Sequence, residues 1–237
     1  MTALTALTAQ NTEGVVAIHD VPVDFIAQQM RVVLDDLGAD CIKTGMLHHA
    51  DVIEVVADTI AECAPGVFVV VDPVMIAKGG VRLLETDAVE ALTERLVPMA
   101  TLVTPNVPEA EALSGVGISD ASGAEAAACT LAQLGPEAVM IKGGHLAGET
   151  VTDFLLFGDC EMETFSTPRI DTRHTHGTGC TLASAAATGI AQGLSVLDAI
   201  ARAHAYVKKA ITLAPGFGRG HGPLDHAHTV TAFGTKD

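Results

Sequence analysis

Positive charge is scarce in this sequence: 13 lysine and arginine residues stand against 29 acidic residues, and the formal net charge is -16. A surface with this balance repels phosphate backbones and anionic lipid headgroups. We therefore expect neither a nucleic-acid partner nor a membrane partner. Such a chain can still bind a phosphorylated ligand, provided that backbone N–H groups, a few cations and Mg²⁺ form a local anion pocket.

The chain also has few cysteines and no long apolar run. Its five cysteines include no C-x-x-C pair, and their odd number favours reduced thiols over a disulfide framework. The sequence contains no apolar stretch of about 18 residues or more, and its first residues lack the basic segment of a signal peptide. These absences predict a cytoplasmic protein. Hydrophobic residues make up 49% of the 237 positions, which predicts one large core and a single domain over residues 1–237.

Runs rich in valine and isoleucine alternate with segments of helical period, a pattern typical of β-α-β units in an α/β protein with a mostly parallel sheet. Two strand-like runs around Gly158-Asp159 predict a hairpin at the sheet edge. Two helices follow, one near 179–192 and one that starts at Ser195, with Asp198 as in a capping box. The other predicted strands lie near 2–8, 39–43, 67–71, 100–104 and 137–142, and the other helices near 22–37, 49–64, 86–97, 108–114 and 121–134.

A glycine-rich turn, Thr175-His-Gly-Thr-Gly-Cys-Thr181, runs directly into one of these helices. Gly177 and Gly179 let the backbone approach a ligand, and the helix N-terminus directs free N–H groups at negative charge. Cys180 is placed to accept a proton, because a helix N-terminus tends to lower the pKa of a thiol. Taken alone, the glycines could instead serve tight packing, with Cys180 as a buried small residue.

Polar residues follow three predicted strands at the ends where ligand crevices of open α/β sheets lie. Asp72 follows the strand near 67–71, Asn106 and Glu109 follow the next strand, and Lys142 ends the strand near 137–142. Each has an ordinary interpretation as a turn former, a first-turn residue or a solvated lysine. Together they indicate a site in which hard oxygen ligands suit Mg²⁺ and a cation contacts phosphate.

On these residues the chain resembles the hydroxymethylpyrimidine/phosphomethylpyrimidine kinases of thiamine biosynthesis. The resemblance implies a three-layer ribokinase-like fold, ATP and Mg²⁺ as cofactors, and transfer of the γ-phosphoryl group to a pyrimidine hydroxymethyl or phosphate oxygen. The matching segments are Leu7-Thr-Ala-Gln-Asn-Thr12, Lys43-Thr-Gly-Met-Leu47, Val71-Asp-Pro-Val-Met-Ile-Ala-Lys-Gly-Gly80, Thr104-Pro-Asn-Val-Pro-Glu109, Ile141-Lys-Gly-Gly-His145, His176-Gly-Thr-Gly-Cys-Thr181 and Gly220-His-Gly-Pro223.

The resemblance assigns a role to each matching residue. On the substrate side, Gln10 is implied to hydrogen-bond the pyrimidine, while Met46 and Val74 pack on its ring. On the transfer side, the resemblance implies an anion hole formed by Gly177, Thr178 and Gly179, and a general base, Cys180. The implied phosphate contacts come from Asp72, Asn106, Glu109, Lys142 and Thr178. The resemblance also implies that Asp72 and Glu109 hold Mg²⁺ through water.

The chain departs from the family pattern at its start. Family members begin with a further strand and a glycine-rich turn of the type G-S-D-S-S-G-G-A-G, and this sequence starts after that unit. We expect a form extended by that unit to be more stable and more active. We also expect a homodimer and a mobile lid around residues 76–80.

Two other functions fit the same motifs. Some vitamin kinases of the superfamily share the Gly-Thr-Gly-Cys arrangement, so a pyridoxal-type kinase is one alternative. A pyrimidine-binding scaffold that has lost catalysis is the other, although such a scaffold has no need of the phosphoryl-transfer residues. A zinc site built from the histidines at 174, 176, 221, 226 and 228 is disfavoured, because no cysteine lies at a useful spacing.

Overall fold

The structure is a computed structural model that describes residues 1–76, 80, 82–230 and 234. The central element is a six-stranded sheet with the order β3-β4-β5-β6-β7-β8. The first four strands are parallel and the last two are antiparallel, so the hairpin at the sheet edge is confirmed. The strands are β3 (Cys41–Thr44), β4 (Phe68–Val71), β5 (Leu102–Val103), β6 (Ala138–Ile141), β7 (Thr150–Phe157) and β8 (Glu161–Pro168). Most of the predicted lid, residues 77–79, lies outside the described residues.

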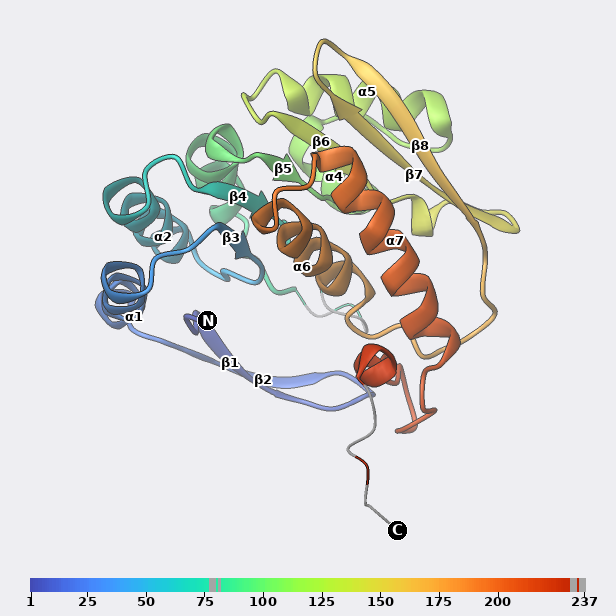
Figure 1. Ribbon diagram of the computed structural model, residues 1–237, viewed down its shortest axis with the longest axis horizontal. Helices are drawn as coiled ribbons and strands as arrows, with labels where there is room; N and C mark the ends of the chain where they lie inside the picture. The colour runs from blue at the N-terminus through green and yellow to red at the C-terminus, as the bar shows by residue number, and fades with distance from the viewer. Residues whose placement is uncertain (77–79, 81, 231–233, 235–237) are drawn as a thin grey trace.

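Helices cover both faces of this sheet, which confirms the three-layer α/β/α architecture (Figure 1). The helices of one face are α1 (Val23–Asp36), α2 (Ala50–Cys63), α3 (Ala88–Ala91), α4 (Val107–Ser114) and α5 (Ala121–Ala132). The other face carries α6 (Thr178–Ala191) and α7 (Val196–Thr212). Short helical segments complete the described chain: η1 (Leu92–Leu96), η2 (Val97–Met99), η3 (Gly143–His145) and η4 (His226–Thr229).

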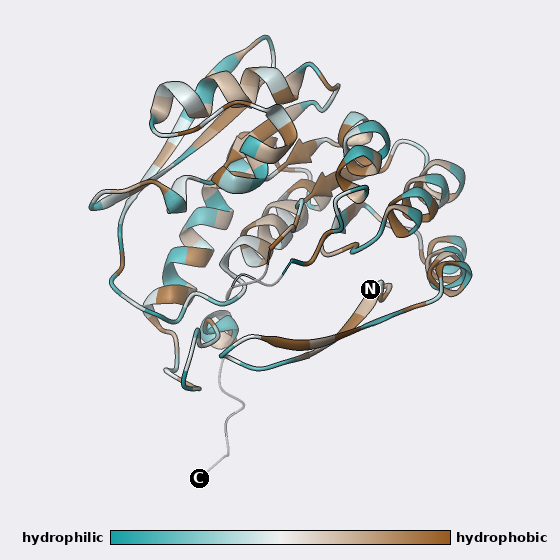
Figure 2. Cartoon of the chain, turned by 180° about the vertical axis from the view of Figure 1, so that it is seen from behind, coloured by the Kyte–Doolittle hydropathy of each residue, from teal (hydrophilic) through white to brown (hydrophobic). Residues whose placement is uncertain are grey.

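Side chains of the buried strands alternate between the two helical layers, as a period of two requires. In β4, Val69 and Val71 belong to the cluster beneath α1 and α2, whereas Val70 packs with α6 and α7. Both faces are apolar because the parallel strands are covered on both sides. The strands and the inner sides of the helices are correspondingly rich in hydrophobic residues (Figure 2). No helix in the described part of the chain is long and apolar enough to cross a membrane.

Small residues allow α6 and α7 to pack closely. A Cβ added at Gly189 would lie 2.7 Å from Ala199 Cβ, so the two helices meet where one of them has no side chain. The helix α7 begins as predicted: its N-cap is Ser195, whose side chain accepts a hydrogen bond from the Asp198 N–H at 3.1 Å. On its other side α6 packs against β3 and β4.

The first predicted strand is placed wrongly. Residues 2–8 were expected as a strand among the β-α-β units of the sheet, but β1 (Ala6–Gln10) pairs antiparallel with β2 (Val15–Asp20) in a separate ribbon. Figure 1 shows this ribbon running outside the three layers. Its turn is held by the C-terminal part of the chain, where the His221 N–H donates to Thr12 O at 2.7 Å. The sheet therefore has β3 as one edge.

Candidate functional site

Three parallel strands deliver the predicted polar residues to one edge of the sheet. The chain leaves β4 at Asp72, whose N–H donates to Thr44 O at 3.2 Å. It leaves β5 at Thr104, and it leaves β6 at Lys142, whose N–H donates to the Pro105 carbonyl at 2.8 Å. Parallel strands end at the same edge, so these side chains converge because of the topology.

A buried carboxylate forms the centre of the site. Asp72 is 1% exposed, and its Oδ1 lies 2.8 Å from Lys142 Nζ and accepts a hydrogen bond from Thr104 Oγ1 at 3.3 Å. The second carboxylate oxygen, Oδ2, lies 3.5 Å from Lys43 Nζ and has no hydrogen-bond partner in the structure. One buried acid thus faces two lysines and the Cys180 thiol.

The charges in this cluster stabilise one another. Burial by itself would raise the pKa of Asp72, but Lys142 and Lys43 outweigh burial, and the pKa lies below its ordinary value. Burial would likewise lower the pKa of Lys142, but Asp72 and Glu109 raise it above its ordinary value. The cluster therefore remains an ion pair of a carboxylate with a lysine, and the second lysine adds positive charge where a phosphate could bind.

Glu109 and Asn106 form the capping box of α4. The Asn106 side chain accepts from the Glu109 N–H at 3.0 Å, and the Glu109 carboxylate accepts from the Asn106 N–H at 2.8 Å. The other Glu109 oxygen accepts from the Met75 N–H at 3.4 Å. Burial raises the pKa of Glu109 above its ordinary value, although Lys142 opposes this. The two residues fix the position of the chain after β4 and β5 as well as adding oxygen atoms to the site.

The glycine-rich turn begins α6 beside this cluster. Gly177 is the N-cap and has a φ of 80°, a conformation that favours glycine. A Cβ added at Gly179 would lie 3.0 Å from Lys142 Nζ, so the missing side chain leaves room for the ammonium group. The first N–H groups of a helix have no partner within it, and here they lie next to a buried lysine. Free N–H groups of this kind are able to bind an anion.

Cys180 also lies at this turn, but its acidity is opposite to the sequence-based expectation. Dehydration of the sulfur and the nearby Asp72 carboxylate raise the pKa of the thiol, and Lys43 and Lys142 only partly oppose them. The expected lowering of this pKa by the helix N-terminus is therefore wrong for the ligand-free site, because dehydration of the sulfur and then the Asp72 carboxylate outweigh the two lysines. Cys180 is exposed, so its dehydration is incomplete and the rise is smaller than full burial would give.

The structure brings the predicted phosphoryl-transfer residues together, but it does not connect all the predicted substrate-binding residues to them. Among the described residues, no hydrogen bond or ion pair links Gln10 to Asp72, and the exposed Gln10 side chain accepts only from Thr8 Oγ1, at 3.4 Å. Val74 lies two residues beyond Asp72 and its N–H donates to Asp72 O. The predicted contacts of Gln10, Met46 and Val74 with a pyrimidine stay predictions.

Sequence reasoning missed two members of the cluster, Lys43 and Thr104. Both stand in the matching segments, directly at the end of a strand, and this position was the signal that could have identified them. Their contact with Asp72 depends on the neighbouring strands β3, β4 and β5 being in parallel register. That register is a property of the fold and is not visible in local sequence.

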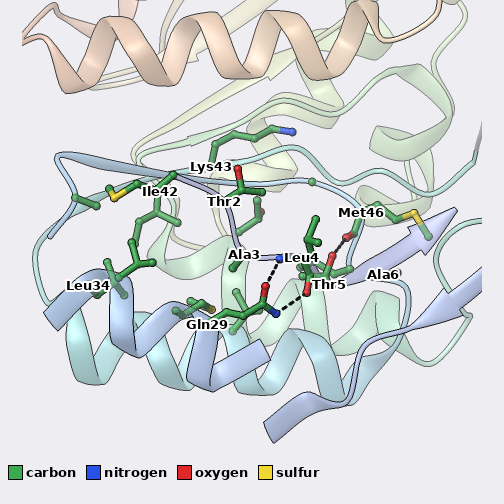
Figure 3. A pocket seen from close by; sticks show the side chains of 18 of the residues that line it. Thr2, Ala3, Leu4, Thr5, Ala6, Gln29, Leu34, Ile42, Lys43 and Met46 are labelled. Atoms are coloured by element: carbon green, nitrogen blue, oxygen red, sulfur yellow. Dashed lines mark hydrogen bonds between the residues drawn. The ribbon is translucent and has the colours of Figure 1, made fainter. Parts of the chain in front are cut away.

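A cavity of about 440 Å³ lies beside the outer edge of β3 (Figure 3). It is enclosed by the N-terminal residues, α1 and the segment that includes Lys43 and Met46. The N-terminal residues are held there by Gln29, which exchanges two 3.0 Å hydrogen bonds with the backbone of Leu4, and by Thr5 Oγ1, which donates to Met46 O at 2.7 Å. The cavity shares Lys43 with the Asp72 cluster, and of the predicted substrate residues only Met46 lines it.

Comparison with known proteins gives this geometry a context. The profile of a family described as phosphomethylpyrimidine kinase matches residues 1–225. The chain is 46% identical over 227 residues to the hydroxymethylpyrimidine/phosphomethylpyrimidine kinase of Streptomyces coelicolor, covering 95% of this chain and 82% of that protein. It is 52% identical over 224 residues to the thiamine biosynthesis bifunctional protein ThiED of Geobacter sulfurreducens; the match covers 94% of this chain but only 45% of that longer protein.

Solved structures of similar fold fall into two groups. A Bacillus subtilis pyridoxal kinase, solved as an ADP complex, has a TM-score of 0.87 and 36% identity; the match covers 96% of this chain and 86% of that chain. The phosphomethylpyrimidine kinase of Clostridium difficile 630 has a TM-score of 0.78 and 35% identity, over 89% of this chain and 86% of that chain.

Proposed function

Because this chain belongs to the phosphomethylpyrimidine kinase family, we propose that it phosphorylates 4-amino-5-hydroxymethyl-2-methylpyrimidine, its monophosphate, or both, with ATP as the phosphoryl donor. The observation that carries this proposal is the meeting of Asp72, Lys142 and the start of α6 at one edge of the sheet. A phosphoryl group in transfer needs such preorganised positive charge and N–H donors. We treat residues 1–237 as one kinase domain in this reaction.

Each group in the site has a place in the proposed transfer. The substrate oxygen attacks the γ-phosphorus of ATP, a new O–P bond forms, and the bond to the β-phosphate oxygen breaks to release ADP. The Cys180 thiolate takes the proton of the attacking hydroxyl when the substrate is the alcohol. Lys142 and Lys43 balance the phosphate charge, while the N–H groups of the Gly177–Gly179 turn hold the transferring oxygens. Gln10, Met46 and Val74 orient the pyrimidine.

The residues present fit Mg²⁺ bound through water. Asp72 Oδ2 is a buried carboxylate oxygen without a hydrogen-bond partner, and Glu109 adds a second carboxylate near the same lysine. Mg²⁺ keeps several waters and takes few protein carboxylates when a nucleotide supplies the other oxygens. Asp72 and Glu109 would hold the hydrated ion, which when bound would offset the charge of the nucleotide phosphates. Asn106 supports this arrangement by fixing Glu109.

The test is ATP consumption measured in parallel with hydroxymethylpyrimidine, its monophosphate and pyridoxal. We expect turnover with at least one pyrimidine that exceeds turnover with pyridoxal. Asp72→Asn should abolish it, because the substitution removes the charge that holds both lysines. The matched control is Asp198→Asn, which changes an exposed carboxylate on α7 outside the site and should retain turnover. Turnover of pyridoxal alone would contradict the assignment.

A pyridoxal kinase is the second candidate, and one observation favours it. Solved structures that align closely in shape include pyridoxal kinases from Bacillus subtilis and Staphylococcus aureus, at TM-scores of 0.87. The curated relatives named as pyrimidine kinases are more similar in sequence, with identities of 46% for two of them. We rank the pyrimidine first for that reason. A catalytically silent pyrimidine-binding scaffold would give no ATP consumption in the assay.

The same assignment leads us to place the enzyme in the cytoplasm, as a homodimer. Free thiols at all five cysteines are consistent with a reducing compartment. Sedimentation of the purified chain would measure the assembly, and a monomer at micromolar concentration would contradict this part of the proposal.

A further inference from the structure

Three metal-binding side chains meet at a place that the phosphoryl-transfer site does not use. Asp20 is the last residue of β2, and His48 and His49 lie in the connection from β3 to α2. Asp20 Oδ1 is 3.7 Å from His48 Nε2, and Asp20 Oδ2 is 3.3 Å from His49 Nε2. One ligand atom from each of the three residues lies within 4.8 Å of the others.

These separations match a metal site better than they match hydrogen bonds. Zn²⁺ binds nitrogen and oxygen at about 2.0–2.1 Å, so two ligands at a tetrahedral angle lie about 3.4 Å apart. A charge-assisted hydrogen bond would draw nitrogen and oxygen to about 2.7–2.9 Å. The Asp20–His48 and Asp20–His49 separations therefore leave room for an ion between the three groups.

His48 is held in the orientation that a ligand requires. Its Nδ1 is 2.9 Å from Leu83 O. A carbonyl can only accept, so Nδ1 carries a proton, and in the neutral imidazole Nε2 then presents its lone pair toward Asp20. The His48 carbonyl in turn accepts from the Glu85 N–H at 2.9 Å, and the residue has a φ of 66°, which is uncommon for a side chain other than glycine. A metal-binding histidine typically makes a hydrogen bond of the kind that His48 Nδ1 makes, through the ring nitrogen that does not bind the metal.

The surroundings favour a cation. The site borders a hollow of about 780 Å³ whose described lining includes Asp24, Asp51 and Asp87 but no lysine or arginine. The side chain of His48 is 12% exposed and that of His49 is 37% exposed, so the site is partly dry and still open to an ion from solvent. Water can complete four-coordination.

We propose that Asp20, His48 and His49 bind one Zn²⁺ ion, separate from the kinase site. Two imidazoles and one carboxylate suit zinc and its neighbours among the transition metals, whereas Mg²⁺ and Ca²⁺ prefer oxygen ligands. The ion would join the end of β2 to the connection between β3 and α2. Because β2 pairs along its length with β1, zinc fastens the whole ribbon that carries Gln10 to the body of the molecule.

Zinc binding is tested with the tag-free chain, stripped with a chelator and titrated with Zn²⁺ in the presence of excess Mg²⁺. We expect saturable binding, weakened at least about tenfold by His49→Ala and by Asp20→Asn, since even loss of an outer-shell partner costs that much. Both substitutions are at exposed or half-exposed positions, so the fold should survive them; circular dichroism checks this. The matched control is His19→Ala, which removes the exposed neighbouring histidine of the same strand and should leave the affinity unchanged.

Hydrogen exchange of the same variants tests the fastening of the ribbon. Zn²⁺ should slow exchange of the β1 and β2 amides in the parent and in His19→Ala, but not in His49→Ala. The zinc site is disproved if the parent shows no saturable binding, or if His49→Ala and Asp20→Asn bind as the parent does, because the ion then lies elsewhere, for example on exposed cysteines. Binding at the site with no change in ribbon exchange would disprove the fastening role. Neither result depends on kinase activity.

Discussion

At Cys180 two influences of opposite sign meet. The start of α6 and two lysines favour a thiolate, while partial dehydration and the Asp72 carboxylate favour the thiol. The thiol form prevails in the ligand-free site. A role as general base consequently requires that the thiol lose its proton before it accepts the proton of the substrate, and substitution at this position can separate that role from simple packing.

We predict that Cys180→Ser lowers kcat on the order of a hundredfold, the usual scale for loss of a positioned base, because a hydroxyl loses its proton much less readily than a thiol. Nucleotide affinity should change little, since the helix N-terminus and Lys142 remain. The matched control is Cys129→Ser, at an exposed cysteine on α5, which should keep the parent rate. Initial rates at saturating ATP give the comparison. A Cys180→Ser rate within about threefold of the parent would mean that the residue only packs.

A second prediction concerns pH. A base works in its deprotonated form, and the pKa of Cys180 lies above its ordinary value, so the active fraction still grows in the alkaline range. We expect kcat to rise with pH beyond about 8.5, the ordinary value for a thiol. In Cys180→Asp the carboxylate is ionised throughout this range, and the rise should disappear from whatever activity remains. An alkaline rise that persists in Cys180→Asp would assign it to another group.

Among the elements, those that depend on local pattern were predictable and those that depend on distant pairing were not. The helix α1 follows from its apolar spacing, and the hairpin of β7 and β8 follows from Gly158-Asp159 between two strand-like runs. The predicted helix near 86–97 is instead a short α3 followed by the segments η1 and η2, the second of which contains Pro98. Proline lacks the N–H that a regular helix would use there.

The ribbon of β1 and β2 shows the limit of sequence reasoning most clearly. Both strands are mostly exposed, and they pair with each other and not with the central sheet. The contact of their turn with the segment around His221 joins residues about 200 positions apart, as the Arg219–Glu13 ion pair illustrates. The same reason explains Lys43: its type and strand-end position were visible, but its contact with Asp72 needed the fold.

A third prediction tests how the end of β6 is positioned. A Cβ added at Gly143 would overlap the backbone oxygen of Thr152 on β7, and backbone cannot move aside cheaply. Gly143→Ala should therefore lower the free energy of unfolding by about 1–3 kcal/mol, as overpacking does. The loss corresponds to about 2–4 °C in Tm for each kcal/mol. Turnover should fall too, because Lys142 is the preceding residue.

The neighbouring glycine supplies the control. A Cβ at Gly144 would meet nothing within 4 Å, and the residue is exposed, so Gly144→Ala should keep both Tm and turnover. Thermal unfolding followed by circular dichroism compares the two variants directly. Equal Tm values for Gly143→Ala and Gly144→Ala would show that β7 shifts without cost, which would contradict the close packing of η3 on that strand.

At the scale of the whole molecule, the balance of charge opposes the chemistry of the site. The formal net charge of -16 repels an anionic nucleotide at long range, whereas in the proposed site Lys43 and Lys142 would attract its phosphates at short range. Salt screens the long-range repulsion between exposed groups strongly and screens buried pairs much less. The fold therefore separates a negative exterior from a largely buried site in which Lys43 and Lys142 face the carboxylates of Asp72 and Glu109.

The last prediction follows from that exterior. Carboxylates outnumber basic groups 29 to 13, so their mutual repulsion destabilises the compact state at low ionic strength. Raising NaCl from about 0.01 M to about 0.1 M shortens the screening length from about 30 Å to about 10 Å. We expect Tm to rise over this interval, because screening relieves more repulsion in the folded state, where the charges are closer, than in the unfolded chain.

Calorimetry measures the shift in Tm, and tetramethylammonium chloride should reproduce it if screening is the cause. A Tm that falls with both salts would mean that surface ion pairs such as Arg31–Glu62 contribute more to stability than the net repulsion removes.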